Sequence, residues 1–98
     1  MSHTSHVRLL PWSGPEGKRA ILVTDGTVGP LSLLADRIEN QQIESAAFIV
    51  ELARPMVEAA PDLTADELRW VTRRLSESLT NVLIIAESRA QRILPYDE

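Results

Sequence analysis

PDLTADELRWV, residues 61–71, marks the point at which this chain begins its last helix. Thr64 and Glu67 have the spacing of a capping box, in which each side chain accepts a hydrogen bond from the backbone N–H of the other residue. Leu63 and Leu68 stand where a hydrophobic staple would pack across the helix start. The pattern therefore predicts a second helix over residues 64–94, which ends before Pro95.

Apolar residues continue along this helix at steps of three and four, a spacing typical of one buried face. The principal row is Leu68, Thr72, Leu75, Leu79, Val82, Ala86 and Ile93, widened by Val71, Leu83 and Ala90.

Residues 30–60 predict a first helix, kinked near Pro55, with Pro30 suited to its first turn. This helix carries two apolar rows. The first row is Leu31, Leu34, Ile38, Gln41, Ser45, Phe48 and Leu52, and the second is Ile43, Ala46, Val50, Ala53, Val57 and Ala60. Because only a few residues around Pro61 separate the two helices, we expect them to fold back antiparallel.

The segment before the helices predicts a β-hairpin over residues 7–25, after a flexible polar tail, residues 1–6. VRLLPW and RAILVTD are rich in apolar and β-branched residues, and SGPEGK separates them. Pro15 and Gly17 suit the second and fourth positions of a type I turn that begins at Gly14. Pro11 removes one donor from the strand ladder, so the first strand is expected to be an edge strand or to bend near its end.

The two apolar rows of the first helix predict association. A two-helix hairpin covers only one side of that helix, and a short β-hairpin covers only part of the other. Ile43, Val50 and Val57 would then partly face solvent in a monomer, whereas a twofold axis lets the same row meet itself. The predicted fold class is α+β, mainly α: a β-hairpin and a long antiparallel helical hairpin, paired into a homodimeric four-helix bundle with these residues in the interface.

Composition bounds the function. The chain of 98 residues fits one domain. Its net charge of -4 argues against a general binder of nucleic acid or of acidic membranes. It has no cysteine, which excludes a disulfide and a thiolate site. Its apolar runs are far shorter than the roughly 20 residues that span a bilayer, and no secretory signal is evident, so we expect a cytoplasmic protein without membrane contact.

No motif for catalysis or for cofactor binding is evident. His3 and His6, the histidines of the chain, lie in the predicted tail without a third ligand, so no metal site is predicted. Glu44, Glu51 and Glu58 share one helical ridge, which favours a solvated ridge over acid–base chemistry. We therefore predict that the protein is not an enzyme and needs no cofactor.

Mid-helix amides form the first candidate contact. Gln41 and Gln42 could fix the register between helices, as a buried amide does in coiled coils, or hold a polar ligand. Alternatively, the first apolar row is partly exposed at Gln41 and the amides are simply solvated. The β-hairpin is expected either to pack on the helices with Trp12 as its anchor or to pair with its copy in a dimer. A cavity near Gln41, Gln42 and Trp12 would be the site of such a ligand.

A basic, aromatic patch forms the second candidate contact. Its members are Arg69, Trp70, Arg73 and Arg74. Such a patch can hold an anion or an acidic partner helix. However, Asp66 lies three residues before Arg69 and Glu77 four after Arg73, so local ion pairs account for much of it.

The segment RLLPWSGPEGK, residues 8–18, together with LADRIE at 34–39, the Thr-x-x-Glu-Leu-Arg helix start and AESRA at 86–90, resembles a group of small, largely uncharacterised actinobacterial proteins. The resemblance spans most of the chain. It implies no activity and no functional residues.

Three functions follow as hypotheses. The first is a non-enzymatic homodimer that acts through protein–protein interaction, as a regulatory adaptor with an unidentified protein partner. The alternative is a small-ligand-binding protein. A DNA-binding regulator that reads with the hairpin is less favoured, because the hairpin offers only Arg8, Lys18 and Arg19 as cations.

Overall fold

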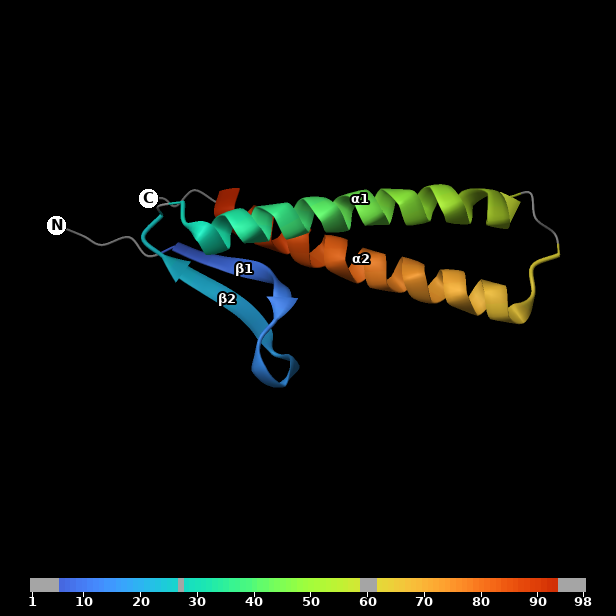
Figure 1. The fold of residues 1–98 in the computed structure, drawn as a ribbon, viewed down its shortest axis with the longest axis horizontal. Coiled ribbons are helices and arrows are strands. Elements are labelled where there is room, and N and C mark those ends of the chain that lie inside the picture. The colour runs from blue at the N-terminus through green and yellow to red at the C-terminus, as the bar shows by residue number, and fades with distance from the viewer. Residues whose placement is uncertain (1–5, 27, 59–61, 94–98) are drawn as a thin grey trace.

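The computed structural model describes residues 6–26, 28–58 and 62–93. In chain order it contains β1 (His6–Ser13), a short 3-10 turn (Pro15–Gly17), β2 (Arg19–Thr24), α1 (Pro30–Glu58) and α2 (Ala65–Ile93). The strands form a two-stranded antiparallel sheet, and the two long helices run antiparallel to each other (Figure 1). The predicted β-hairpin followed by a helical hairpin is confirmed. Residues 1–5 of the predicted tail and the predicted helix ends at 59–60 and 94 lie outside the described residues.

The capping box at the start of α2 is confirmed. The backbone N–H of Glu67 donates to Oγ1 of Thr64 at 3.0 Å, and the backbone N–H of Thr64 donates to Oε1 of Glu67 at 2.9 Å. Two backbone donors that the helix cannot satisfy internally thus find partners. At the other end of the helical hairpin, α1 begins with Pro30 and remains one helix through Pro55.

The turn of the β-hairpin differs from the predicted type I turn. The closing bond runs from the backbone N–H of Lys18 to the carbonyl of Pro15 at 3.2 Å, one residue later than expected. The central residues Glu16 and Gly17 have φ of 59° and 76°, the left-handed pattern of a type I′ turn. Primed turns match the right-handed twist of paired strands, which is why they are favoured in tight hairpins.

The strand ladder is regular from His6 to Leu9 and is then interrupted. Leu9 pairs with Ile21 and Ser13 pairs with Arg19, so β1 contains two more residues than β2 between these pairs. Pro11 lies in this irregular stretch and has no N–H to donate. The prediction that β1 deviates near Pro11 is therefore confirmed.

The β-hairpin packs on one end of the helical hairpin, beside the start of α1 and the end of α2 (Figure 1). Arg8, Leu9 and Leu10 of β1 are buried, each to 7% exposure. Trp12, the expected anchor, is only half-buried. His6, expected in the tail, is the first residue of β1. The sheet is thus held mainly by consecutive residues of β1.

The interface between α1 and α2 uses neither predicted row of α1. The buried residues of this helix are Ala35, Glu39, Ile49 and Ala53, with Gln42, Ala46 and Met56 half-buried. This row lies between the two predicted ones. Of its residues, only Ala46 and Ala53 belong to a predicted row, the second. Small side chains allow close approach of two helices, and a single neighbouring helix can bury only one narrow face.

Apart from Ile38, which is half-buried, the larger side chains of both predicted α1 rows therefore remain exposed. In the first row, Leu34 and Phe48 are 43% and 64% exposed, and in the second, Val50 and Val57 are 45% and 76% exposed. On α2 the buried apolar residues among those described are Val71 and Ile85, whereas the predicted principal row is half-buried or exposed from Leu68 to Ala86.

Candidate interaction surfaces

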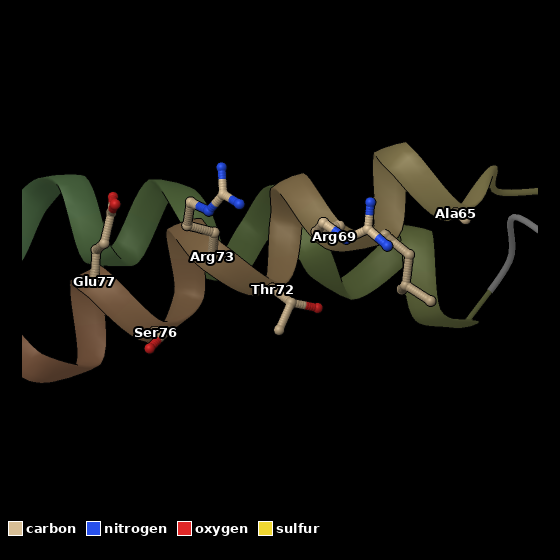
Figure 2. Close-up of a pocket in the computed structure, with 7 residues that line it drawn as sticks. Ala65, Arg69, Thr72, Arg73, Ser76 and Glu77 are labelled. Carbon is tan, nitrogen blue, oxygen red and sulfur yellow. The ribbon is translucent and has the colours of Figure 1, made fainter.

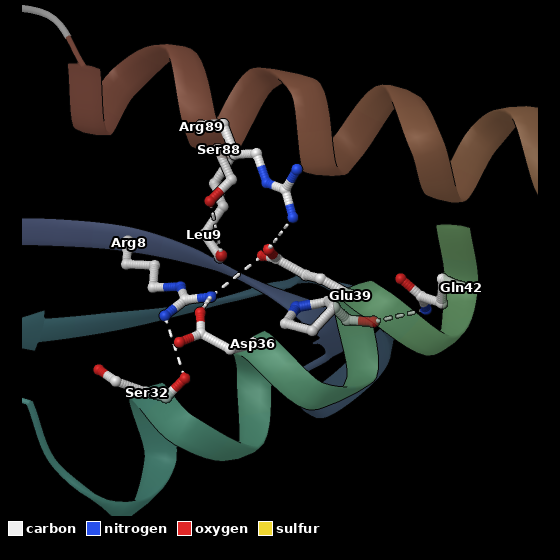
Figure 3. Close-up of polar contacts among 9 residues, drawn as sticks. Arg8, Leu9, Ser32, Asp36, Glu39, Gln42, Ser88 and Arg89 are labelled. Carbon is white, nitrogen blue, oxygen red and sulfur yellow. Dashed lines mark hydrogen bonds and ion pairs between the residues drawn. The ribbon is translucent and has the colours of Figure 1, made fainter. Parts of the chain in front are cut away.

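A partly buried cluster of ion pairs ties β1 to both helices (Figure 3). Nη2 of Arg8 lies 2.7 Å from Oδ1 of Asp36 and 3.2 Å from Oε2 of Glu39. Nη1 of Arg8 donates to the carbonyl of Ser32 at 3.1 Å, and Nη2 of Arg89, from α2, lies 3.6 Å from Oε1 of Glu39. Because Glu39 is 1% exposed, its carboxylate is stabilised by arginines rather than by water.

Two side-chain hydrogen bonds hold the backbone of β1 next to this cluster. Oγ of Ser88, on α2, donates to the carbonyl of Leu9 at 3.1 Å, and Nε2 of Gln42, on α1, donates to the carbonyl of Pro11 at 3.3 Å. These bonds satisfy carbonyls in the part of β1 where the ladder is irregular.

One side of the α1–α2 interface opens into a polar groove of about 260 Å³. The lining residues are Ile38, Gln41, Gln42, Ser45, Arg74, Glu77, Ser78 and Asn81. Nη1 of Arg74 donates to Oε1 of Glu77 at 2.9 Å. The groove brings the predicted residues Gln41 and Gln42 together with Arg74, but Trp12 does not line it. Gln42, rather than the exposed Gln41, makes the inter-element hydrogen bond.

The predicted basic patch is divided between two surfaces. Arg69 and Arg73 line a shallow hollow of about 650 Å³ formed by α2 residues alone, and with Glu77 they project to the same side of that helix (Figure 2). Nη1 of Arg69 lies 3.5 Å from Oδ1 of Asp66, as predicted. The predicted pairing of Glu77 with Arg73 is wrong, because Glu77 pairs with Arg74 instead. Among the described residues, Arg73 has no ion-pair partner.

The side of the α1–α2 interface opposite the groove is aliphatic. On each helix, the groove-lining residues lie on one flank of the buried row, so residues on the other flank face the opposite side. We call these residues the aliphatic face: Ile43, Val50 and Val57 on α1, and Leu68, Leu75, Leu79 and Val82 on α2. Ile43, Leu68 and Leu79 are 36%, 50% and 60% exposed. The three predicted interface residues of α1 thus belong to a wider apolar surface.

Comparison with protein-family models, with curated proteins and with solved structures finds no match. Within the described ranges, no group of three or more His, Cys, Asp or Glu side chains is placed to hold a metal ion. None of the helices within those ranges is both long enough and apolar enough to cross a membrane.

The hairpin cations considered for DNA reading are mostly occupied. Arg8 is buried in the ion-pair cluster, and Nη1 of Arg19 lies 2.6 Å from Oε1 of Glu87. Lys18 remains exposed at the turn. A phosphate backbone would have to compete with these carboxylates, which weighs against that function.

Sequence reasoning missed the residues that fix β1. Arg8 was considered only as a surface cation, and Glu39 and Ser88 were not singled out. Glu39 lies four residues after Ala35 and three before Gln42, so these residues form a row of small and polar side chains along one face of α1. From the sequence alone, such a row is expected to be exposed, because the partners of Glu39 and Gln42 lie on β1.

Proposed function

We propose that this chain is a non-enzymatic homodimeric helical protein that acts through protein–protein interaction, as a regulatory adaptor. The observation that carries the proposal is the aliphatic face. Val50 on α1 and Leu79 on α2 lie on the same side of the helical hairpin and are 45% and 60% exposed. Fully burying one such side chain contributes roughly 1.5–3 kcal/mol, so a monomer forgoes considerable stabilisation.

A second copy of the chain is the simplest partner that would bury the aliphatic face. A twofold axis brings identical apolar surfaces together and buries each residue twice. Two antiparallel helices from each protomer then form a four-helix bundle with short connections within each chain.

Light scattering after size-exclusion chromatography, at micromolar concentration, tests the dimer. We expect the wild-type mass to be twice that of the chain. Val50→Glu should give a monomer with unchanged helical content by circular dichroism, because Val50 is partly exposed in the single chain and a charge there is tolerated. The matched control is Ser45→Glu, an exposed α1 position that lines the groove on the opposite side, which should stay dimeric.

A monomeric wild type would refute the homodimer. If Val50→Glu and Ser45→Glu both remained dimeric, the chain would be dimeric through another surface and the assignment of the aliphatic face would be wrong.

The polar groove supports a second candidate function, the binding of a small polar ligand. Its amides from Gln41 and Gln42 and the Arg74–Glu77 pair offer donors and acceptors. However, a volume of about 260 Å³ lies just below the usual range for ligand pockets, roughly 300–1,000 Å³. A thermal-shift screen of amino acids, amides and sugars would support this function if one compound stabilised the wild type but not Gln41→Ala. If the screen finds no such compound, the adaptor remains the better proposal.

A further inference from the structure

The outer edge of β2 has no neighbouring strand. The sheet has two strands, and Figure 1 shows β1 between β2 and α1. Ser88 and Gln42 of the helices donate to carbonyls of β1. Among the residues that the structure describes, only β1 forms hydrogen bonds with the backbone of β2. The N–H and C=O groups along the other edge of β2 are therefore open to a further strand.

The edge of β2 lacks the usual protection against such pairing. Natural proteins protect an exposed edge with lysine, proline, a bulge or an inward-pointing charge. The sequence of β2 is RAILVT, residues 19–24, and its single charge stands at its first position. The additional residues of the irregular stretch belong to β1. Ile21 and Val23 are 54% and 63% exposed. An apolar, unprotected edge of this kind selects an extended strand as its occupant.

The sequence of β2 is complementary to itself. In an antiparallel pair with a twofold axis at Leu22, the residues that lie opposite each other across two copies are Arg19 and Asp25, Ala20 and Thr24, and Ile21 and Val23. Asp25 directly follows β2 and is exposed. Opposite charges and branched apolar side chains are both stabilising when they lie directly across two strands. A second copy of β2 therefore offers matching side chains as well as a matching backbone.

Charge selects this register over its neighbours. A twofold axis at Val23 would place Ile21 opposite Asp25, and an axis at Ile21 would place Arg19 opposite Val23. Each alternative sets a charge against an apolar side chain. Nη1 of Arg19 already donates to Oε1 of Glu87 at 2.6 Å, but a guanidinium has five N–H donors and can bind a second carboxylate.

We propose that β2 pairs antiparallel with β2 of a second copy about Leu22, which makes a four-stranded sheet across two chains. This contact uses other residues than the aliphatic face and does not depend on it. Because one pair of short strands is a small interface, we expect the pairing at higher concentrations than the homodimer, so that it joins homodimers to one another. The β-hairpin then has two roles, since β1 packs on the helices of its own chain.

Disulfide trapping tests the register on the full chain, which has no cysteine of its own. Ile21→Cys and Val23→Cys, mixed in a glutathione redox buffer, should form a mixed disulfide, because residues directly opposite have Cα atoms roughly 4.5–5.5 Å apart, within the range of disulfides. Each variant alone should cross-link several-fold less, because identical positions then lie on a diagonal. The matched control replaces Ile21→Cys with Val7→Cys, which is 50% exposed but lies on β1, and should also cross-link several-fold less.

A charge exchange tests the same register without a covalent bond. Arg19→Glu and Asp25→Arg each place like charges opposite each other in a pair of identical chains, whereas a mixture of the two variants restores both attractive pairs. In the Val50→Glu background, which removes the aliphatic face from association, we expect light scattering at increasing concentration to show several-fold weaker association for each variant alone. The mixture should associate as Val50→Glu does.

Three results would overturn the strand pairing: equal trapping in the mixture and in the single cysteine variants, equal trapping with Val7→Cys, or a charge mixture that associates no better than its components. The aliphatic face is judged separately, by the mass of the wild type at micromolar concentration. A monomer there that still forms the mixed disulfide would refute the homodimer alone, and a dimer without the mixed disulfide would refute the strand pairing alone.

Discussion

Arg8 of β1 and Glu39 of α1 form an ion pair, with 3.2 Å between Nη2 and Oε2, although both residues are almost fully buried. Glu39 is 1% exposed and Arg8 is 7% exposed. Burying two charges costs several kcal/mol per ion, which their attraction offsets only in good geometry. The pair therefore specifies where β1 docks, since any displacement of the strand separates charges that water cannot reach.

Removing one member of this pair should be costly. Arg8→Met is expected to lower the free energy of unfolding by about 3–5 kcal/mol, because the Glu39 carboxylate stays buried after losing a close partner. Arg19→Met, which breaks the exposed pair with Glu87, should cost less than about 1 kcal/mol. Urea unfolding followed by circular dichroism measures both.

The double variant Arg8→Met/Glu39→Leu tests whether the two residues are coupled, whatever the loss of stability caused by Arg8→Met alone. Replacing both charges with apolar side chains should recover most of the stability. If the two single changes instead add in the double variant, the residues are not energetically coupled and the account of β1 docking fails.

The turn of the β-hairpin offers a stabilising change. Glu16 has φ 59°, a left-handed conformation that costs an ordinary residue roughly 1–2 kcal/mol and that asparagine tolerates better. Glu16→Asn should therefore raise the free energy of unfolding by up to about 1 kcal/mol, with Glu16→Ala as the control that gives no gain. Equal stability of the two variants would show that this conformation is not strained.

Thr64 should act through its capping hydrogen bond. Thr64→Ala is expected to lower the free energy of unfolding by about 1 kcal/mol, whereas Thr64→Ser and Thr64→Asp should be nearly neutral because both retain an acceptor oxygen. Thermal unfolding of the three variants measures the difference. Similar losses for Ala and Ser would contradict the observed cap.

The capping box also predicts a dependence on pH. The backbone N–H of Thr64, and secondarily its side chain, donate to the Glu67 carboxylate and lower its pKa. A lowered folded-state pKa contributes stability above the unfolded pKa, about 4.3, that is lost as the pH falls through the folded value. The stability difference between wild type and Glu67→Gln should therefore shrink below about pH 4. NMR titration should find the pKa still lowered in Thr64→Ala, because the backbone donor remains; a return to the ordinary value would contradict its leading role.

Local signals allowed the helical hairpin and the β-hairpin to be predicted. The Thr64–Glu67 spacing fixes a helix start through bonds within one turn, and the Gly and Pro residues at 14–17 fix the position of a reversal. The type of turn was not predictable from Pro15 alone, because the twist of the paired strands favours a type I′ turn over the expected type I turn.

The face of α1 that meets α2 required tertiary information. Periodicity favoured the rows that contain Leu34 and Val50, since these are the larger apolar residues. The actual row includes Glu39 and Gln42, which look solvent-exposed until β1 brings Arg8 and the carbonyl of Pro11 to them. The same effect hid the ion-pair cluster and left large apolar side chains exposed on both sides of the buried row.

Ala35 provides a direct test of this interface, because it is 0% exposed and belongs to neither predicted row. Ala35→Leu inserts methylene groups into a packed contact, and such overpacking costs about 1–3 kcal/mol. For a domain of this size, 1 kcal/mol corresponds to a change in Tm of roughly 4–8 °C, so a fall of at least that size is expected by calorimetry. Ala47→Leu makes the same chemical change at an exposed position of α1 and should leave Tm within a degree or two of wild type. If Ala35→Leu were as harmless as Ala47→Leu, α1 would not meet its neighbours through the row that contains Ala35, and the aliphatic face and the polar groove on either side of that row would have to be reassigned.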